Sequence, residues 1–153
     1  MDTRPYISVV TPVYKTEESL HELCERLKNT IEKIDSNYEI ILVNDSSPDN
    51  SWEVIKELCQ NDNKIKGIEL SRNFGQHMAI RAGLDHAKGN WVVVMDCDLQ
   101  DRPEEIINFY NKTKEGYDLV VGKRNTRNDS LFRKIASSIY FYLFTKLSDL
   151  KLS

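Results

Sequence analysis

The segment Asp96–Gln100, which reads DCDLQ, places two carboxylates one residue apart directly after an apolar run. Such side chains repel each other unless a cation or a set of hydrogen-bond donors offsets their charge. Oxygen ligands at this kind of turn suit Mg²⁺ or Mn²⁺, which complete their coordination with phosphates and water. Alternatively, one aspartate caps the following helix and the other is solvated. The isolated Asp-x-Asp pattern leaves both interpretations open.

Charge is distributed unevenly along the chain. The formal net charge is −3, yet the residues from 122 onward hold seven Lys or Arg against two Asp, so this tail is +5 and residues 1–121 are −8. A basic tail attracts anions such as phosphates, whereas the overall negative charge argues against a general nucleic-acid binder. Together with Gln100, the tail favours a metal and phosphate site at Asp96 and Asp98.

Length and composition predict one domain over residues 1–153. A chain of 153 residues that is 40% hydrophobic and 29% charged is typical of a single globular domain. The N-terminus lacks the layout of a signal peptide, and no apolar run approaches the roughly 20 residues of a membrane span. Cys24, Cys59 and Cys97 are odd in number and lack metal-ligand spacing, so we expect reduced thiols in a cytoplasmic protein.

Apolar β-branched runs alternate with helical patterns, which is typical of βαβ units on a parallel sheet. Strands are predicted at Tyr6–Val10, Glu39–Val43, Ile65–Leu70, Trp91–Met95 and Leu119–Val121. Helices are predicted over 20–34 with Thr16 as N-cap, and over Ser51–Gln60, Gln76–Ala87 and Pro103–Lys114, the last with Asp101 and Glu104 at capping-box spacing.

A polar segment follows every predicted strand. In chain order these segments read TPVYKTEES, NDSSPDNS, SRNFGQH, DCDLQDRP and GKRNTR. In open parallel sheets, ligands bind at the carboxyl ends of the strands, near a switch in strand order. A purely structural domain has less reason to gather so many reactive side chains there, so we expect the functional site at this edge of the sheet.

Four segments together resemble successive parts of a family 2 glycosyltransferase with the GT-A fold. They read ISVVTPVYKTEESL, ILVNDSSPDNSWEVI, LSRNFGQHMAIRAGLDHAKGNWVVVMDCDLQDRPEEI and YDLVVGKRNTRNDSLFRK. The resemblance is closest to the branch of dolichyl-phosphate mannose synthases and bacterial polyprenyl-phosphate sugar transferases. It implies an α/β fold with a Rossmann-like, mostly parallel sheet flanked by helices. Because the family's acceptor-side segments have no counterpart here, the resemblance also implies a domain that is incomplete at its C-terminus.

The resemblance implies an enzyme that moves a sugar from a nucleotide-diphosphate sugar to an acceptor, with inversion at the anomeric carbon. In the named branch the acceptor is a polyprenyl phosphate, which would place the protein in the cytoplasm, peripheral to the inner face of the membrane, with membrane-anchored full-length relatives. The alternative is a non-catalytic sugar-nucleotide-binding or interaction module that has lost the acceptor half. A nicotinamide-binding domain is disfavoured because TPVYKTE lacks the glycine-rich turn expected after its first strand.

Roles at the phosphate end follow from the same resemblance. Asp96 and Asp98 match the family's Asp-x-Asp, which holds the divalent cation, Mg²⁺ or Mn²⁺, and the donor. Gln100 matches an extension of that motif and is expected to complete the metal shell. Arg124 and Arg133 match basic positions that face phosphates, where the charge of a departing nucleoside diphosphate needs stabilisation. A solvated basic face is the alternative for these arginines.

At the base end, the resemblance assigns Thr11, Pro12 and Tyr14 to a first loop that wraps the base and ribose. Asp45 matches the aspartate that accepts a hydrogen bond from the base. Ser46 stands where the family commonly has glycine.

The tail also carries an apolar stripe at helical spacing between Leu131 and Leu150. We favour a helix that packs on the rest of a longer domain over one that lies on an anionic membrane surface. If its partner is absent, the exposed stripe predicts self-association.

Overall fold

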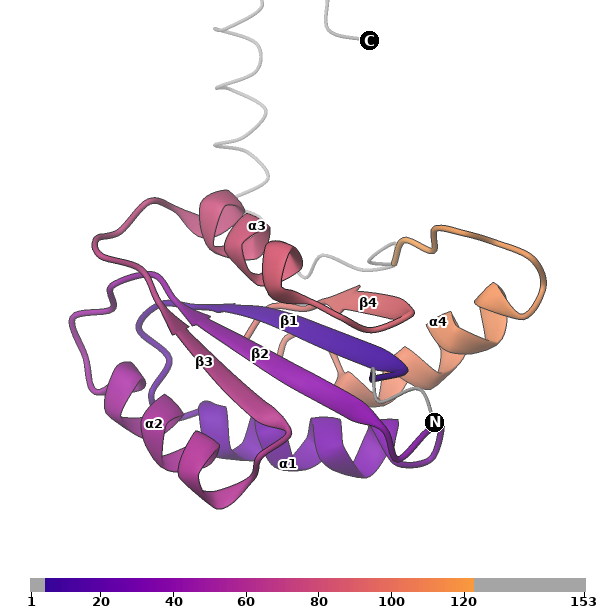
Figure 1. Ribbon diagram of the computed structural model, residues 1–153, viewed down its shortest axis with the longest axis horizontal. Helices are drawn as coiled ribbons and strands as arrows, with labels where there is room; N and C mark the ends of the chain where they lie inside the picture. The colour runs from indigo at the N-terminus through magenta and orange to yellow at the C-terminus, as the bar shows by residue number, and fades with distance from the viewer. Residues whose placement is uncertain (1–4, 123–153) are drawn as a thin grey trace, which may run out of the picture. The chain divides into compact units, whose positions relative to one another are not determined.

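Four strands form a parallel sheet in the order β3-β2-β1-β4 (Figure 1). The computed structural model describes residues 5–122, and those up to Val120 belong to one compact unit. The strands are β1 (Ile7–Val13), β2 (Tyr38–Asn44), β3 (Ile65–Glu69) and β4 (Trp91–Val94). The helices are α1 (Leu20–Ile31), α2 (Ser51–Asn61), α3 (Gln76–His86) and α4 (Ile106–Thr113), preceded by a 3₁₀ turn, η1 (Pro103–Glu105).

The two central strands are buried along their whole length. β1 reads ISVVTPV and β2 reads YEIILVN, and every residue of both is buried. Strands covered on both faces read as near-continuous apolar runs, which explains their sequences. Ser8 and Glu39 are two of the polar residues in these runs, and they bind each other, because the Ser8 hydroxyl donates to Glu39 Oε1 at 2.6 Å.

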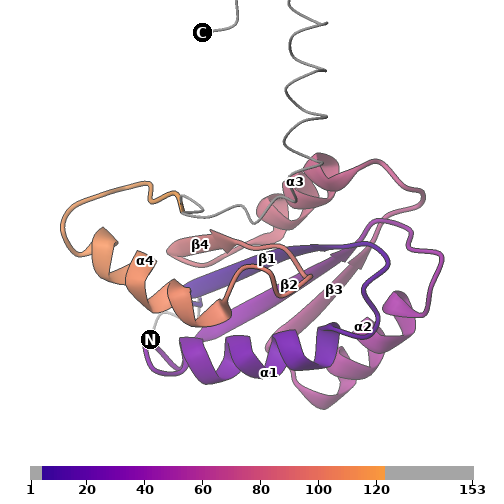
Figure 2. The same cartoon turned by 180° about the vertical axis from the view of Figure 1, so that it is seen from behind.

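Helices cover both faces of the sheet (Figures 1 and 2). α1, α2 and α4 lie on one face, and α3 lies on the other. The chain steps outward from β1 to β2 and β3, then returns across the opposite face to place β4 on the other side of β1. Right-handed crossovers require this arrangement, because reversing the direction of the steps reverses the covered face.

The larger part of the core lies beneath α1 and α2. The apolar stripe of α1, with Leu20, Leu23 and Leu27 all fully buried, packs there. The amphipathic pattern predicted for this helix is therefore confirmed. All three cysteines are described and are free thiols, as predicted.

Below α3 a smaller cluster forms around Val10 and Val43, and Gly83 makes its close packing possible. A Cβ atom added to Gly83 would lie 2.3 Å from Val10 Cγ1 and 3.1 Å from Val43 Cγ2. The absence of a side chain at Gly83 therefore sets how closely α3 approaches β1 and β2.

We expect Gly83→Ala to lower the free energy of unfolding by about 1–3 kcal/mol, because an added methyl overpacks this contact. The sign of this change in the free energy of unfolding is informative, because helix propensity alone would make alanine stabilising by roughly 1 kcal/mol. Urea unfolding of the variant measures it. Leu84→Ala, at a half-exposed position on the same helix, is the matched control and should change stability little. A stabilised Gly83→Ala protein would contradict the close approach.

The strand predicted at Leu119–Val121 is not formed. Leu119 is 80% exposed and Val121 77% exposed, and both lie in irregular backbone. The prediction was wrong because an apolar run becomes a strand only where a neighbouring strand pairs with its backbone, and among residues 5–122 none does so here.

Two predicted helix caps were wrong. The first helix begins at Leu20 with Ser19 as N-cap, and Thr16 instead lies in the preceding turn. The capping box at Asp101 and Glu104 does not form, since the 3₁₀ turn has Arg102 as N-cap and no side-chain cap. Glu104 instead pairs with Arg26 of α1 at 2.8 Å, a tertiary contact that local spacing does not reveal.

None of the helices within residues 5–122 is both long and apolar enough to span a bilayer. Arg124, Arg133 and the predicted tail helix lie outside the described residues.

Candidate functional site

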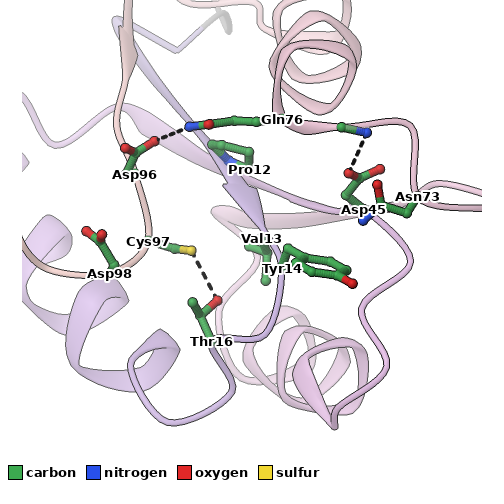
Figure 3. Close-up of a pocket in the computed structure, with 11 residues that line it drawn as sticks. Pro12, Val13, Tyr14, Thr16, Asp45, Asn73, Gln76, Asp96, Cys97 and Asp98 are labelled. Atoms are coloured by element: carbon green, nitrogen blue, oxygen red, sulfur yellow. Dashed lines mark hydrogen bonds between the residues drawn. The ribbon is translucent and has the colours of Figure 1, made fainter. Parts of the chain in front are cut away.

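A cavity of about 340 Å³ opens where the carboxyl ends of the strands meet the β3–α3 loop. β1 and β4 are neighbours here. Successive strands are added to one side of β1 as far as β3, and β4 is added to its other side, so this is the switch point at which open α/β sheets bind ligands. The cavity is lined by Pro12, Val13, Tyr14, Thr16, Asp45, Asn73, Gly75, Gln76, Asp96, Cys97 and Asp98 (Figure 3). Residues from four separate segments thus converge, at the edge predicted from the sequence.

Asp45 follows β2 and is almost fully buried, with 3% exposure. Its Oδ1 accepts the backbone N–H of Phe74 and its Oδ2 accepts that of Gly75, both at 2.8 Å. Gly75 is the N-cap of α3 and has φ of +91°, a conformation that glycine adopts without strain. Asp45 therefore fixes the start of α3 while its carboxylate lines the cavity.

Asp96 and Asp98 follow β4 and point in different directions (Figure 3). Asp96 is half-buried, and its Oδ1 accepts a hydrogen bond from Gln76 Nε2 at 2.6 Å. Asp98 is exposed, and its Oδ1 accepts the backbone N–H of Gln100 at 3.0 Å. This turn holds Leu99 at φ of +59°. Each carboxylate therefore has one oxygen held by the protein and a second oxygen without a hydrogen bond from the described residues.

Cys97, between the two aspartates, turns into the core. Its Sγ lies 3.1 Å from Thr16 Oγ1, and its side chain is 7% exposed. Burial raises the pKa of the Cys97 thiol above its usual value, so the thiol stays protonated at neutral pH.

The loops after β1 and β2 are tied together beside the cavity. The Lys15 amide donates to Ser47 Oγ at 2.7 Å, and the Asn50 amide donates to Glu17 Oε2 at 2.6 Å. Tyr14, 43% exposed, lies on the cavity rim at the start of the first loop. These cross-loop bonds hold the backbone next to Tyr14 in one position.

Asp49 is the most connected residue of the second loop. Burial by itself would raise its pKa, but hydrogen bonds from Ser47, Ser51 and the Glu17 amide lower the pKa to about 2. Ser46, which directly follows Asp45 in the same loop, has φ of +52°. The left-handed turn typical of glycine thus forms with serine in this position.

Two carboxylates at the cavity fit a divalent cation that takes its other ligands from a bound phosphate and water. No group of three His, Cys, Asp or Glu side chains within residues 5–122 could hold a metal by itself. Mg²⁺ is commonly bound through only one or two carboxylates together with substrate phosphates. The donor set of Asp96 and Asp98 is of this kind.

Five of the nine residues singled out from the sequence line the cavity, namely Pro12, Tyr14, Asp45, Asp96 and Asp98. The first strand extends to Val13 rather than Val10, so Thr11 lies inside β1, fully buried, and its Oγ1 has no hydrogen-bond partner among the described residues. Gln100 is exposed and contacts Asp98 through its backbone amide rather than through its side chain.

Sequence reasoning overlooked Asn73 and Gln76, which also line the cavity. Their segment, SRNFGQH, was recognised as a polar cluster after the third strand, and this was the available signal. Nothing in the sequence indicated that the Gln76 side chain donates a hydrogen bond to Asp96.

The chain matches the model of a known protein family, described as glycosyl transferase family 2, over residues 8–152. It is 42% identical to the Bacillus subtilis protein named uncharacterized glycosyltransferase YkcC, over 94% of this chain and 45% of that protein. It is 45% identical to the undecaprenyl-phosphate 4-deoxy-4-formamido-L-arabinose transferase of Proteus mirabilis, over 92% of this chain and 43% of that protein. The chain thus spans less than half the length of these relatives.

Two solved structures share the fold. Staphylococcus aureus TarS 1–349 in complex with UDP-GlcNAc aligns with a TM-score of 0.61 at 23% identity, over 80% of this chain and 36% of that one. The mannosyltransferase PcManGT from Pyrobaculum calidifontis, in complex with GDP-Man and Mn²⁺, aligns with a TM-score of 0.56 at 22% identity, over 62% of this chain and 28% of that one.

Proposed function

The chain belongs to glycosyl transferase family 2, and from this membership we propose that its cavity binds a nucleoside-diphosphate sugar for transfer to an acceptor, with inversion. Residues 1–153 would be the nucleotide-sugar-binding part of a GT-A domain. The observation that carries the proposal is the convergence of Asp45, Asp96 and Asp98 on one cavity at the switch point of the sheet. Carboxylates around a cavity repel an anionic diphosphate unless a cation offsets their negative charge.

For the diphosphate end, we propose that Asp96 and Asp98 hold Mg²⁺ or Mn²⁺ through the carboxylate oxygens that the protein leaves unbonded. A divalent cation there would neutralise charge on the departing nucleoside diphosphate. The hydrogen bonds from Gln76 and the Gln100 amide limit how far either carboxylate rotates. The solved mannosyltransferase complex with GDP-Man and Mn²⁺ supports a divalent cation in this fold.

For the base end, we propose that Asp45 and Tyr14 contact the nucleotide. The Asp45 oxygens each accept one backbone amide and keep a second lone pair for a donor on the base. The tethered first loop presents the Tyr14 ring at the rim, where it can pack on a planar base. Pro12 also lines the cavity and is proposed to contact the nucleotide with them. We do not assign a contact to Thr11, whose side chain is fully buried outside the cavity lining.

Arg124 and Arg133 are proposed to contact phosphates, because a guanidinium fork donates two hydrogen bonds to an anion at once. The acceptor is proposed to be a polyprenyl phosphate at the membrane, supported by the name of the Proteus mirabilis relative. This assignment places the protein in the cytoplasm, peripheral to the inner face of the membrane.

Calorimetric titration of the 153-residue chain with UDP and with GDP, each with Mn²⁺ and with a chelator, tests the proposal. Binding of one nucleotide that is strengthened by Mn²⁺ is the expected result, and it would also identify the base. Binding without hydrolysis or transfer of the matching nucleotide sugar would instead indicate a non-catalytic binding module. Failure of a demonstrably folded chain to bind either nucleotide would refute the donor site.

A further inference from the structure

Gln76 is the first residue of α3, and its position is fixed from both sides. Just before it, the amides of Phe74 and Gly75 are held by the buried Asp45 carboxylate. At its other end, its Nε2 donates to Asp96 Oδ1 at 2.6 Å (Figure 3). The backbone that Asp45 holds thus leads directly into Gln76, whose side chain contacts Asp96 after β4.

This hydrogen bond determines which carboxylate oxygen of Asp96 remains available to a ligand. With Oδ1 occupied by the Gln76 amide, the carboxylate is held in one orientation and Oδ2 is the oxygen left without a described hydrogen bond. The neighbouring Asp98 is restrained in the same way through its own Oδ1. Two carboxylates that are flexible in isolation are therefore each fixed by one amide donor.

A glutamine suits this position better than a charged donor. A lysine or arginine at position 76 would neutralise Asp96 and compete with a cation for it, whereas a neutral amide orients the carboxylate and leaves its charge intact. A carboxylic acid at position 76 would instead add a like charge at hydrogen-bond distance. The amide thus combines orientation with retention of the full negative charge.

We propose that Gln76 is a positioning residue that orients Asp96 for binding a divalent cation, and so adjusts the cation affinity of the site. The inference rests on the proposed function, because it assumes that Asp96 is a metal ligand. Hydrogen-bonding partners behind metal ligands typically contribute 10–100-fold to metal affinity. Because Gln76 is exposed, we expect about the lower end of this range.

The test is Gln76→Met in the full 153-residue chain, which preserves side-chain length and helix propensity while removing the donor. Mn²⁺ binding is followed by the electron paramagnetic resonance signal of free Mn²⁺, with UDP and with GDP present in turn. Nucleotide affinity is measured separately in chelator. His77→Ala, an exposed change on the same helical turn, is the matched control. We expect roughly tenfold weaker Mn²⁺ binding in Gln76→Met, unchanged Mn²⁺ binding in the control, and no change in metal-free nucleotide affinity.

Three outcomes would overturn the inference, and they differ in what else they exclude. Equal Mn²⁺ affinity in Gln76→Met and wild type would refute the positioning role and leave the proposed function intact. Loss of nucleotide affinity in chelator as well would mean that Gln76 holds the loop at Asp45 rather than orienting Asp96. Absence of Mn²⁺ binding by the wild-type chain would refute the proposed metal site and the inference together.

Discussion

Asp98→Asn is expected to weaken Mn²⁺-dependent binding of the nucleoside diphosphate by about a hundredfold or more, because a metal ligand should matter at least as much as a residue behind it. Asparagine keeps an oxygen that can accept the Gln100 amide, so the turn that places Leu99 at φ of +59° should persist. Asp98 is exposed, and no core packing depends on it. The substitution therefore removes a negative charge and little else.

Titration calorimetry with and without Mn²⁺, together with a thermal melt, checks this prediction. Asp85→Asn is the matched control, because Asp85 is also an exposed aspartate whose one described ion pair is a 3.8 Å contact with Arg81 on α3. The control should bind as the wild type does. If Asp98→Asn retains wild-type affinity in both conditions, Asp98 is not a metal ligand and the assignment of this segment is lost.

The second large effect is expected from Glu39, a buried carboxylate at the opposite end of the sheet from the cavity. Glu39 accepts hydrogen bonds from the Ser8 hydroxyl at 2.6 Å, from the Lys88 amide at 2.8 Å and from the Lys66 ammonium. The Ser8 oxygen in turn accepts the Gly89 amide at 2.8 Å. One carboxylate thus connects β1, β2, β3 and the turn that leads into β4.

Glu39→Ala should lower the free energy of unfolding by about 2–4 kcal/mol, because it leaves buried donors without their acceptor. The contribution of Lys66 is discounted, since that side chain is 47% exposed and can bind water instead. Urea unfolding measures the loss. Glu53→Gln removes a carboxylate that is 68% exposed and paired with Lys56 on α2, so it is the matched control and should have little effect.

The Glu39 effect should also depend on pH. Burial by itself would raise the Glu39 pKa, but Lys66, Ser8 and the Lys88 amide together lower it below its usual 4.5. A carboxyl whose pKa is lower in the folded state stabilises the protein above its usual pKa, and this stabilisation is lost as the pH falls through the lower folded value.

The stability difference between wild type and Glu39→Gln should therefore be full at about pH 7 and much smaller at about pH 3. Urea unfolding at both pH values measures this difference. A difference that is the same at both pH values would contradict the role of the charged carboxylate.

Much of the fold was predictable because local signals and burial agree. The apolar stripe of α1 and the largely apolar runs of β1 and β2 each predict one structure, and the structure contains them. Leu119–Val121 failed for the opposite reason. Its residue types indicate a strand, but a strand forms only where a neighbouring strand pairs with its backbone, and the segment itself does not specify that neighbour.

The candidate site was predictable in position and only partly in composition. The sequence placed Asp45 after the second strand and Asp96 and Asp98 after the fourth, and parallel strands bring such residues to one edge of the sheet. Gln76 was not identified, because its role depends on a contact between segments 20 residues apart in the chain. Thr11 was assigned to a loop because the end of β1 was placed three residues too early.

The sequence by itself determined the alternation of strands and helices, the family, and the edge of the sheet at which polar residues gather, since these follow from local pattern and from motif order. The tertiary structure alone decided the strand order, the ties of Asp45 to the start of α3 and of Gln76 to Asp96, and the burial of Glu39 among its donors. Such contacts join segments distant in the chain. Their geometry is set by packing of the whole core, which no local pattern encodes.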